Sequence, residues 1–211
     1  GADRLSSISV MKFNDRIVQS TYDALFQVPK PPVAPNVTVA ELNGKVILDW
    51  GSDLAALDNT ETPVNMPGAF KFEGYNVYQL PSVSSNLQSA KRIATYDLET
   101  DPTVVLDEIA DPSGQILRLP VQFGSNSGVL RYFQFTRDYV RDIDKLWNGQ
   151  EYYLAVTAYS VASVGGFIPA SLESQVRVLT VRPKIPFGTV YQTKSGDTVS
   201  VTHVSGVSDG V

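Results

Sequence analysis

The chain has 211 residues, of which 43% are hydrophobic and only 18% are charged, which is enough apolar surface for a buried core and excludes overall disorder. The formal net charge is −5, with 17 basic residues outnumbered by 22 acidic ones, so neither nucleic acid nor an anionic membrane surface is an expected partner. There is no cysteine, which excludes disulfides, thiolate metal sites and thiol nucleophiles.

Residues 1–35 are predicted to form an N-terminal extension with a short helix and a spacer. The stretch Arg16–Phe26 places apolar side chains near one helical face, and Asn14 or Asp15 could cap its start. Residues 29–35 hold four prolines in seven positions, which predicts an extended spacer. We expect the helix to dock against the domain that follows.

From residue 36 the apolar positions follow a period of two, which is typical of strands. Val46, Leu48 and Trp50 alternate with polar residues after the Asn43-Gly44 pair, and Asn-Gly between alternating runs indicates a tight hairpin. The sequence therefore predicts two strands with Trp50 pointing inward.

Further alternating runs predict more strands, and turn signals rather than helices separate them. The predicted strands are residues 70–80, 91–98, 115–121, 130–139, 151–160 and 175–181. Gly74 is a candidate β-bulge, residues 51–69 are predicted to be a polar loop, and residues 99–128 an acid-rich loop with one strand. Strands without intervening helices favour an all-β antiparallel sandwich over residues 36–182.

Three stretches resemble the fibronectin type III family. They are Pro35–Trp50, the run Phe72–Tyr78, and a corner pattern. The corner residues are Leu146, Gly149, Tyr152, Leu154, Val156 and Ala158. The resemblance implies an immunoglobulin-like β-sandwich in which Tyr152 buries its ring and returns its hydroxyl to an upstream backbone group. Such domains have about 100 residues, so residues 51–69 and 99–128 would be enlarged loops.

The resemblance assigns five residues to the framework of the sandwich: Trp50, Tyr75, Leu146, Gly149 and Tyr152. Residues 183–211 form a tail that we expect to begin a further β unit or to pair between subunits, because 189–191 and 197–202 alternate like strands. The helix, the spacer, the FEGYNVY run and the THxSGxSDG segment resemble large secreted or cell-surface proteins of Bacteroidetes-like bacteria. We read the chain as a piece of such a protein.

Few residues are candidates for chemistry. His203 is the sole histidine, it lies in the tail, and the sequence contains no G-x-S-x-G motif, so we expect that the chain is not an enzyme. The enzymatic alternative is an active site built from carboxylates alone. Calcium is the candidate cofactor, because a flexible loop rich in oxygen ligands suits it. Its candidate ligands are Asp97, Glu99, Asp101, Asp107, Glu108 and Asp111, and the opposing interpretation is a solvated loop.

Exposed aromatic side chains are candidates for binding. Trp147 and Tyr139 are the foremost, with Tyr132 and Tyr153 beside them, since aromatic rings can stack on sugars. We expect a structural module of an extracellular or cell-surface assembly, with protein partners or copies of itself, and a fibre joined through terminal strands is one form of it. The alternative is a carbohydrate- or protein-binding module of a larger secreted enzyme. No apolar run is long enough to predict membrane insertion.

Overall fold

The structure is a computed structural model that describes residues 4–23, 26, 29–62, 70–100, 103–163 and 168–186. The predictions for Asp101, for His203 and for the strands of the tail lie outside the described residues.

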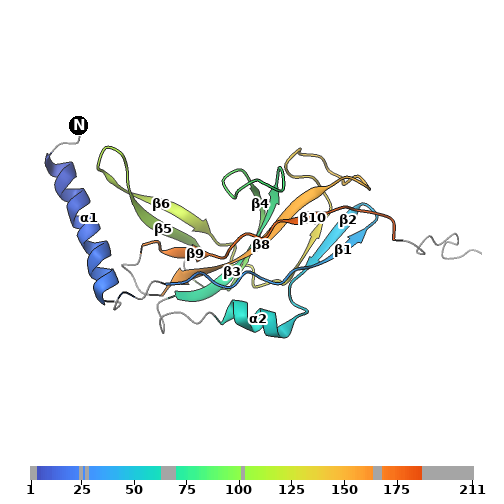
Figure 1. Ribbon diagram of the computed structural model, residues 1–211, viewed down its shortest axis with the longest axis horizontal. Helices are drawn as coiled ribbons and strands as arrows, with labels where there is room; N and C mark the ends of the chain where they lie inside the picture. Colours follow the sequence, from blue (N-terminus) through green and yellow to red (C-terminus); the bar gives the residue numbers. More distant parts are fainter. Residues whose placement is uncertain are drawn as a thin grey trace, which may run out of the picture.

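Ten strands and two helices form within the described ranges (Figure 1). In chain order they are α1 (Arg4–Asp23), β1 (Thr38–Leu42), β2 (Lys45–Asp49), α2 (Leu54–Glu61), β3 (Phe70–Leu80), β4 (Lys91–Asp97), β5 (Val104–Ala110), β6 (Ile116–Phe123), β7 (Tyr132–Phe135), β8 (Tyr152–Ala162), β9 (Ser171–Glu173) and β10 (Leu179–Val181).

The strands build two sheets and a separate hairpin, and every pair is antiparallel. The three-stranded sheet has the order β1-β2-β7, the five-stranded sheet has the order β10-β8-β3-β4 with β9 also on β8, and β5 pairs with β6. One apolar core takes side chains from both sheets, an arrangement compatible with an all-β sandwich.

The first hairpin forms as predicted. Gly44 connects β1 and β2 with a φ of +65°, in the left-handed region that glycine enters without strain. Val46, Leu48 and Trp50 then point into the core, and Trp50 is only 2% exposed. The period of two places Val46 and Leu48 on one face of β2, and Trp50, directly after the strand, continues on the same side.

The two central strands, β3 and β8, are buried on both faces. Leu154, Val156 and Ala158 enter the core between the sheets. On the opposite face of the five-stranded sheet, Tyr159 and Val161 pack against Val105 of the hairpin β5–β6. The pairing of β3 with β8 shifts register between Phe72 and Gly74, so the predicted irregularity at Gly74 is present.

The N-terminal helix is longer than predicted and begins at Arg4 rather than near Asn14 or Asp15. Its inner face is spaced three and four residues apart, with Val10, Phe13 and Ile17 shielded from solvent. Arg16 forms an ion pair with Glu108 of β5 at 2.5 Å, so the helix docks on the hairpin β5–β6 (Figure 1).

The loop predicted over 51–69 contains a helix, α2, instead. Asp53 accepts a hydrogen bond from the Ala56 N–H at 3.1 Å and so caps its start, which satisfies one of the otherwise unpaired amides of the first turn. The polar composition of the segment hid this local signal.

The acid-rich loop predicted over 99–128 is largely the hairpin β5–β6. Asp107 and Glu108 belong to β5 rather than to a loop, and Pro120 lies inside β6. Other strands are shorter than predicted: 130–139 is a strand only over Tyr132–Phe135, and 175–181 only over Leu179–Val181. Strand β9 lies between the predicted strands 151–160 and 175–181, where no strand was predicted.

Candidate functional site

The acidic candidates for calcium lie apart along β4, β5 and their turns. Asp97 at the end of β4 is 2% exposed, and its carboxylate accepts hydrogen bonds from the Ser125 N–H at 2.9 Å and the Ser125 hydroxyl at 2.8 Å. The Tyr159 hydroxyl donates a further, longer bond of 3.4 Å. This carboxylate holds the connection that follows β6 against the five-stranded sheet.

The remaining acidic candidates have separate local partners. Asp107 accepts a hydrogen bond from the Ala170 N–H at 3.3 Å, and Glu108 pairs with Arg16. Asp111 closes the hairpin turn by accepting from the Gln115 N–H at 2.8 Å, and Glu99 lies beside Gly128. Within the described ranges no three His, Asp or Glu side chains gather around a common point, and calcium binding stays a prediction.

The corner pattern occupies the end of the sandwich where β7 leads into β8. The Trp147 N–H donates a hydrogen bond to the buried Tyr152 hydroxyl at 2.9 Å, and Leu146 is buried beneath the turn. Gly149 has a φ of +84°, and its N–H donates to the Pro183 carbonyl at 2.8 Å. A buried tyrosine hydroxyl therefore positions the backbone beside Trp147.

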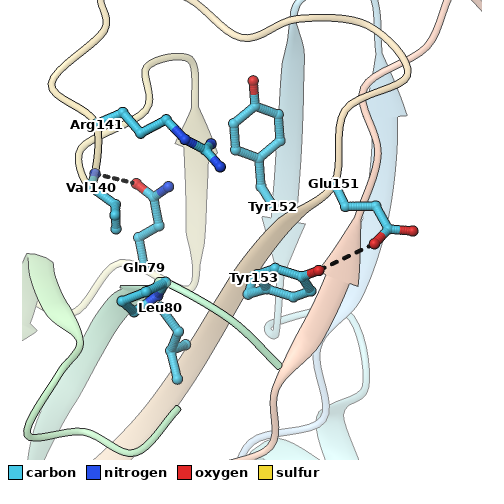
Figure 2. A pocket seen from close by; sticks show the side chains of 8 residues that line it. Gln79, Leu80, Val140, Arg141, Glu151, Tyr152 and Tyr153 are labelled. Atoms are coloured by element: carbon cyan, nitrogen blue, oxygen red, sulfur yellow. Dashed lines mark hydrogen bonds between the residues drawn. The ribbon is translucent and has the colours of Figure 1, made fainter. Parts of the chain in front are cut away.

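A buried glutamine, Gln79, holds the loop that leads to this corner, and no pattern in the sequence singles it out (Figure 2). The Gln79 amide donates to Asp138 at 2.7 Å and its oxygen accepts from the Tyr139 N–H at 2.7 Å and the Val140 N–H at 3.2 Å. Burial disfavours the charged form of Asp138, but hydrogen bonds from Arg141 and Gln79 outweigh it and hold the pKa of Asp138 below its usual value.

The two foremost aromatic candidates differ in exposure. Trp147 is 51% exposed, and the Lys145 ammonium lies 3.7 Å from the centre of its ring, so a sugar could stack only on the other face. Tyr139 is half-buried, stacks on the core residue Phe135 with ring centres 6.2 Å apart, and carries the Arg137 guanidinium over its ring. Trp147 is therefore the better platform for a ligand.

A groove of about 400 Å³ lies between β3 and the residues around Arg131. Its one described carboxylate, Glu61, accepts two bonds from the Arg131 guanidinium, each 2.8 Å long, and one from the Tyr75 hydroxyl at 2.8 Å. Burial and the neighbouring Glu61 carboxylate raise the pKa of Tyr75, so this hydroxyl stays protonated as a donor. The paired carboxylate is a framework element and offers no free base.

A second polar network attaches the hairpin β5–β6 to the five-stranded sheet. The Glu173 carboxylate accepts from Asn76 at 3.0 Å, from the Tyr78 hydroxyl at 2.8 Å and from the Thr157 hydroxyl at 2.5 Å. Asn76 also exchanges two hydrogen bonds of 3.2 Å with Gln122 of β6. Because hydrogen bonds are directional, this network fixes where the hairpin lies on the sheet.

The most distinctive surface feature is apolar. Seven of the 15 residues of β5 and β6 are large hydrophobic side chains exposed to solvent. This set, the hairpin surface, consists of Val104, Leu106, Ile109, Leu117, Leu119, Val121 and Phe123. The strand register divides it between the two faces of the hairpin: Val104, Leu106 and Phe123 share one face, and Ile109, Leu117 and Leu119 share the other. The adjacent helix adds a second exposed stripe at Met11, Val18 and Tyr22. Exposed apolar side chains in such concentration mark interaction sites.

Comparison with protein-family models, with curated proteins and with solved structures found no match. Of the helices in the described part of the chain, neither is long and apolar enough to cross a membrane.

Proposed function

We propose that this chain is a non-enzymatic structural module of an extracellular or cell-surface assembly, which docks on protein partners or copies of itself through the hairpin surface. The observation that carries the proposal is the exposure of that surface: Phe123, for example, is 47% exposed although it stands on a strand. Burial of apolar area stabilises a protein by about 25 cal/mol for each Å² removed from water, and a partner that covers these side chains would gain this free energy on binding.

The proposed architecture is a sandwich similar to fibronectin type III domains, with the hairpin β5–β6 as an enlarged loop. The bond between the Trp147 N–H and the Tyr152 hydroxyl supports this resemblance, because a tyrosine corner belongs to such sandwiches. The two networks around Glu61 and Glu173 support a structural role, since each carboxylate is engaged by several donors. A fibre joined through terminal strands is the more specific form of the proposal.

The mass distribution of the purified chain in solution, with and without calcium, tests the proposal, followed by electron microscopy of any large particle. We expect assemblies larger than one chain, and we expect Leu119→Ser together with Phe123→Ser to shift them toward single chains. Val39→Ser together with Val83→Ser is the matched control. These two side chains are 38% and 59% exposed, against 43% and 47% for Leu119 and Phe123, but they lie on β1 and in the β3–β4 connection. A single-chain particle of unchanged mass in every sample would contradict self-assembly.

Binding of carbohydrate or protein by the corner is the second candidate, favoured by the exposure of Trp147. Retention on insoluble polysaccharides is its test, with Trp147→Ala as the variant that should lose retention. Tyr132→Ala is the control, because Tyr132 is 56% exposed but lies on β7, away from the corner turn. Equal retention of both variants would exclude the corner as the binding site.

A further inference from the structure

We propose that the outer edge of β5 accepts residues 197–202 of a second copy of this chain as an added β-strand. This inference rests on the proposed structural function and names the two surfaces that would join. Strand addition supplies main-chain hydrogen bonds for affinity and side-chain pockets for register.

Strand β5 has one occupied edge. Among the described residues it pairs with β6 alone, over Val104–Ala110, and the hairpin β5–β6 is not continued by either larger sheet. A strand paired on one side presents its other N–H and C=O groups on the opposite side, and on β5 one of these, the Glu108 N–H, already donates to the Asp107 carboxylate at 2.9 Å. The connections to the sandwich run through inward side chains, such as Val105 and Asp107, rather than through this edge.

The two edges of the hairpin differ in how they are protected. Strand β6 contains Pro120, which lacks an N–H, and Val121 is an extra residue that bulges from the ladder between Gln122 and Pro120. Helix α1 packs on β6 as well. Proline, bulges and covering helices are the usual devices against edge pairing. Strand β5 contains neither proline nor lysine, and its charged residues, Asp107 and Glu108, lie in its second half, where Glu108 pairs with Arg16 of α1. The asymmetry therefore points to the first half of β5, residues 104–106, as the receptive edge.

The side chains of the two segments suit one another. Val104 and Leu106, two residues apart on β5, share a face and are both exposed. In the tail, residues 198–202 read Thr-Val-Ser-Val-Thr, so Val199 and Val201 would share a face in an extended strand. β-Branched residues favour strands, and neighbouring apolar pairs on one face stabilise them.

The direction of the chain favours a second copy over the same one. Residues 183 and 184 lie at the corner, where the Lys184 N–H donates to the Leu42 carbonyl at 3.2 Å. The turn of the hairpin β5–β6 lies at the other end, where Gly114 approaches Ser6 of α1 (Figure 1). The last described residues of the chain thus lie far from the hairpin turn, and contacts between the C-terminal end of one copy and the hairpin of the next would be head-to-tail, which gives filaments when the rotation does not close a ring.

Cross-linking of full-length single-cysteine copies tests the proposal, since the native chain has no cysteine. One copy carries Leu106→Cys, the other carries Val201→Cys, and a short bis-maleimide joins thiols that lie close together. We expect a band of two chain masses from this mixture. Val83→Cys, exposed in the β3–β4 connection, replaces Leu106→Cys in the control mixture and should give no such band. Val199→Pro in the donor copy should abolish the band, and Val199→Thr should retain it.

Each outcome decides between the alternatives. Cross-linking within one chain that carries both cysteines, at a dilution where the mixed copies do not react, would mean that the tail folds onto its own hairpin and would overturn the inference. Large particles by mass measurement without the cross-link would reject β5 as acceptor and leave the structural function standing. Single chains without any cross-link would reject both.

Discussion

Removal of the Tyr152 hydroxyl is the sharpest test of how the corner is built. In Tyr152→Phe the ring keeps its place in the core, but the Trp147 N–H loses the acceptor that lies 2.9 Å away. The neighbouring variant Tyr153→Phe is the matched control. Its hydroxyl lies on the solvent side of the same strand and donates to Glu151 at 3.2 Å (Figure 2).

The expected loss for Tyr152→Phe follows from the environment of the bond. Leaving a shielded donor unpaired costs about 1–3 kcal/mol, because the lost hydrogen bond is not replaced by water. For a chain of this size each kcal/mol lowers the melting temperature by about 2–4 °C. We expect no measurable change for Tyr153→Phe, since water replaces its acceptor.

Urea unfolding followed by tryptophan fluorescence measures the difference, because Trp50 is buried in the folded core. The denaturant dependence should be unchanged in both variants, so that the midpoint alone reports stability. Equal midpoints for Tyr152→Phe and Tyr153→Phe would refute the claim that the buried hydroxyl supports the corner.

Two other predictions concern a carboxyl group and two glycines. Burial and then the nearby Asp97 charge raise the pKa of Glu73 above its usual 4.5, so folding binds protons and stability falls as the pH rises from 4.5 through the raised pKa. Glu73→Gln should therefore raise the melting temperature at neutral pH and lose that advantage below pH 4.5. An equal gain in melting temperature at both pH values would contradict the raised pKa of Glu73. Gly74→Ala should lower the melting temperature far more than Gly44→Ala, because a Cβ at Gly74 would overlap the Tyr96 carbonyl. A Cβ at Gly44 would meet open space, so that variant should lose only about 1–2 kcal/mol of stability through backbone strain. The reverse order of the two melting temperatures in thermal unfolding would count against the observed bulge.

Local patterns in the sequence predicted much of the sandwich. The alternation around Val46, Leu48 and Trp50 predicted both the strand and its inward face, because a period of two leaves only one way to bury three apolar side chains. The resemblance of residues 146–158 to a tyrosine corner implied a buried tyrosine that bonds to the upstream backbone, and the Tyr152 hydroxyl accepts from the Trp147 N–H. Each of these signals lies within a few residues of its own effect.

The candidate site could be predicted only in part. Trp147 was singled out as an exposed aromatic residue and is exposed, but Tyr139 turned out to be half-buried on Phe135, since the fold of its loop depends on Gln79 some 60 residues earlier. The acidic residues between 97 and 111 suggested one loop, yet pairing of β5 with β6 distributes them along a hairpin.

What the sequence by itself determined is therefore the pattern of strands, the turn at Gly44 and the inward residues of β2 and β8, because these depend on side-chain period and on local backbone geometry. Only the tertiary structure decided that β8 is covered on both faces and that seven apolar residues of β5 and β6 remain exposed to water while Val105 is buried. A strand with apolar side chains on both faces has the same local pattern whether or not something covers it, and the covering segments here lie far away in the chain.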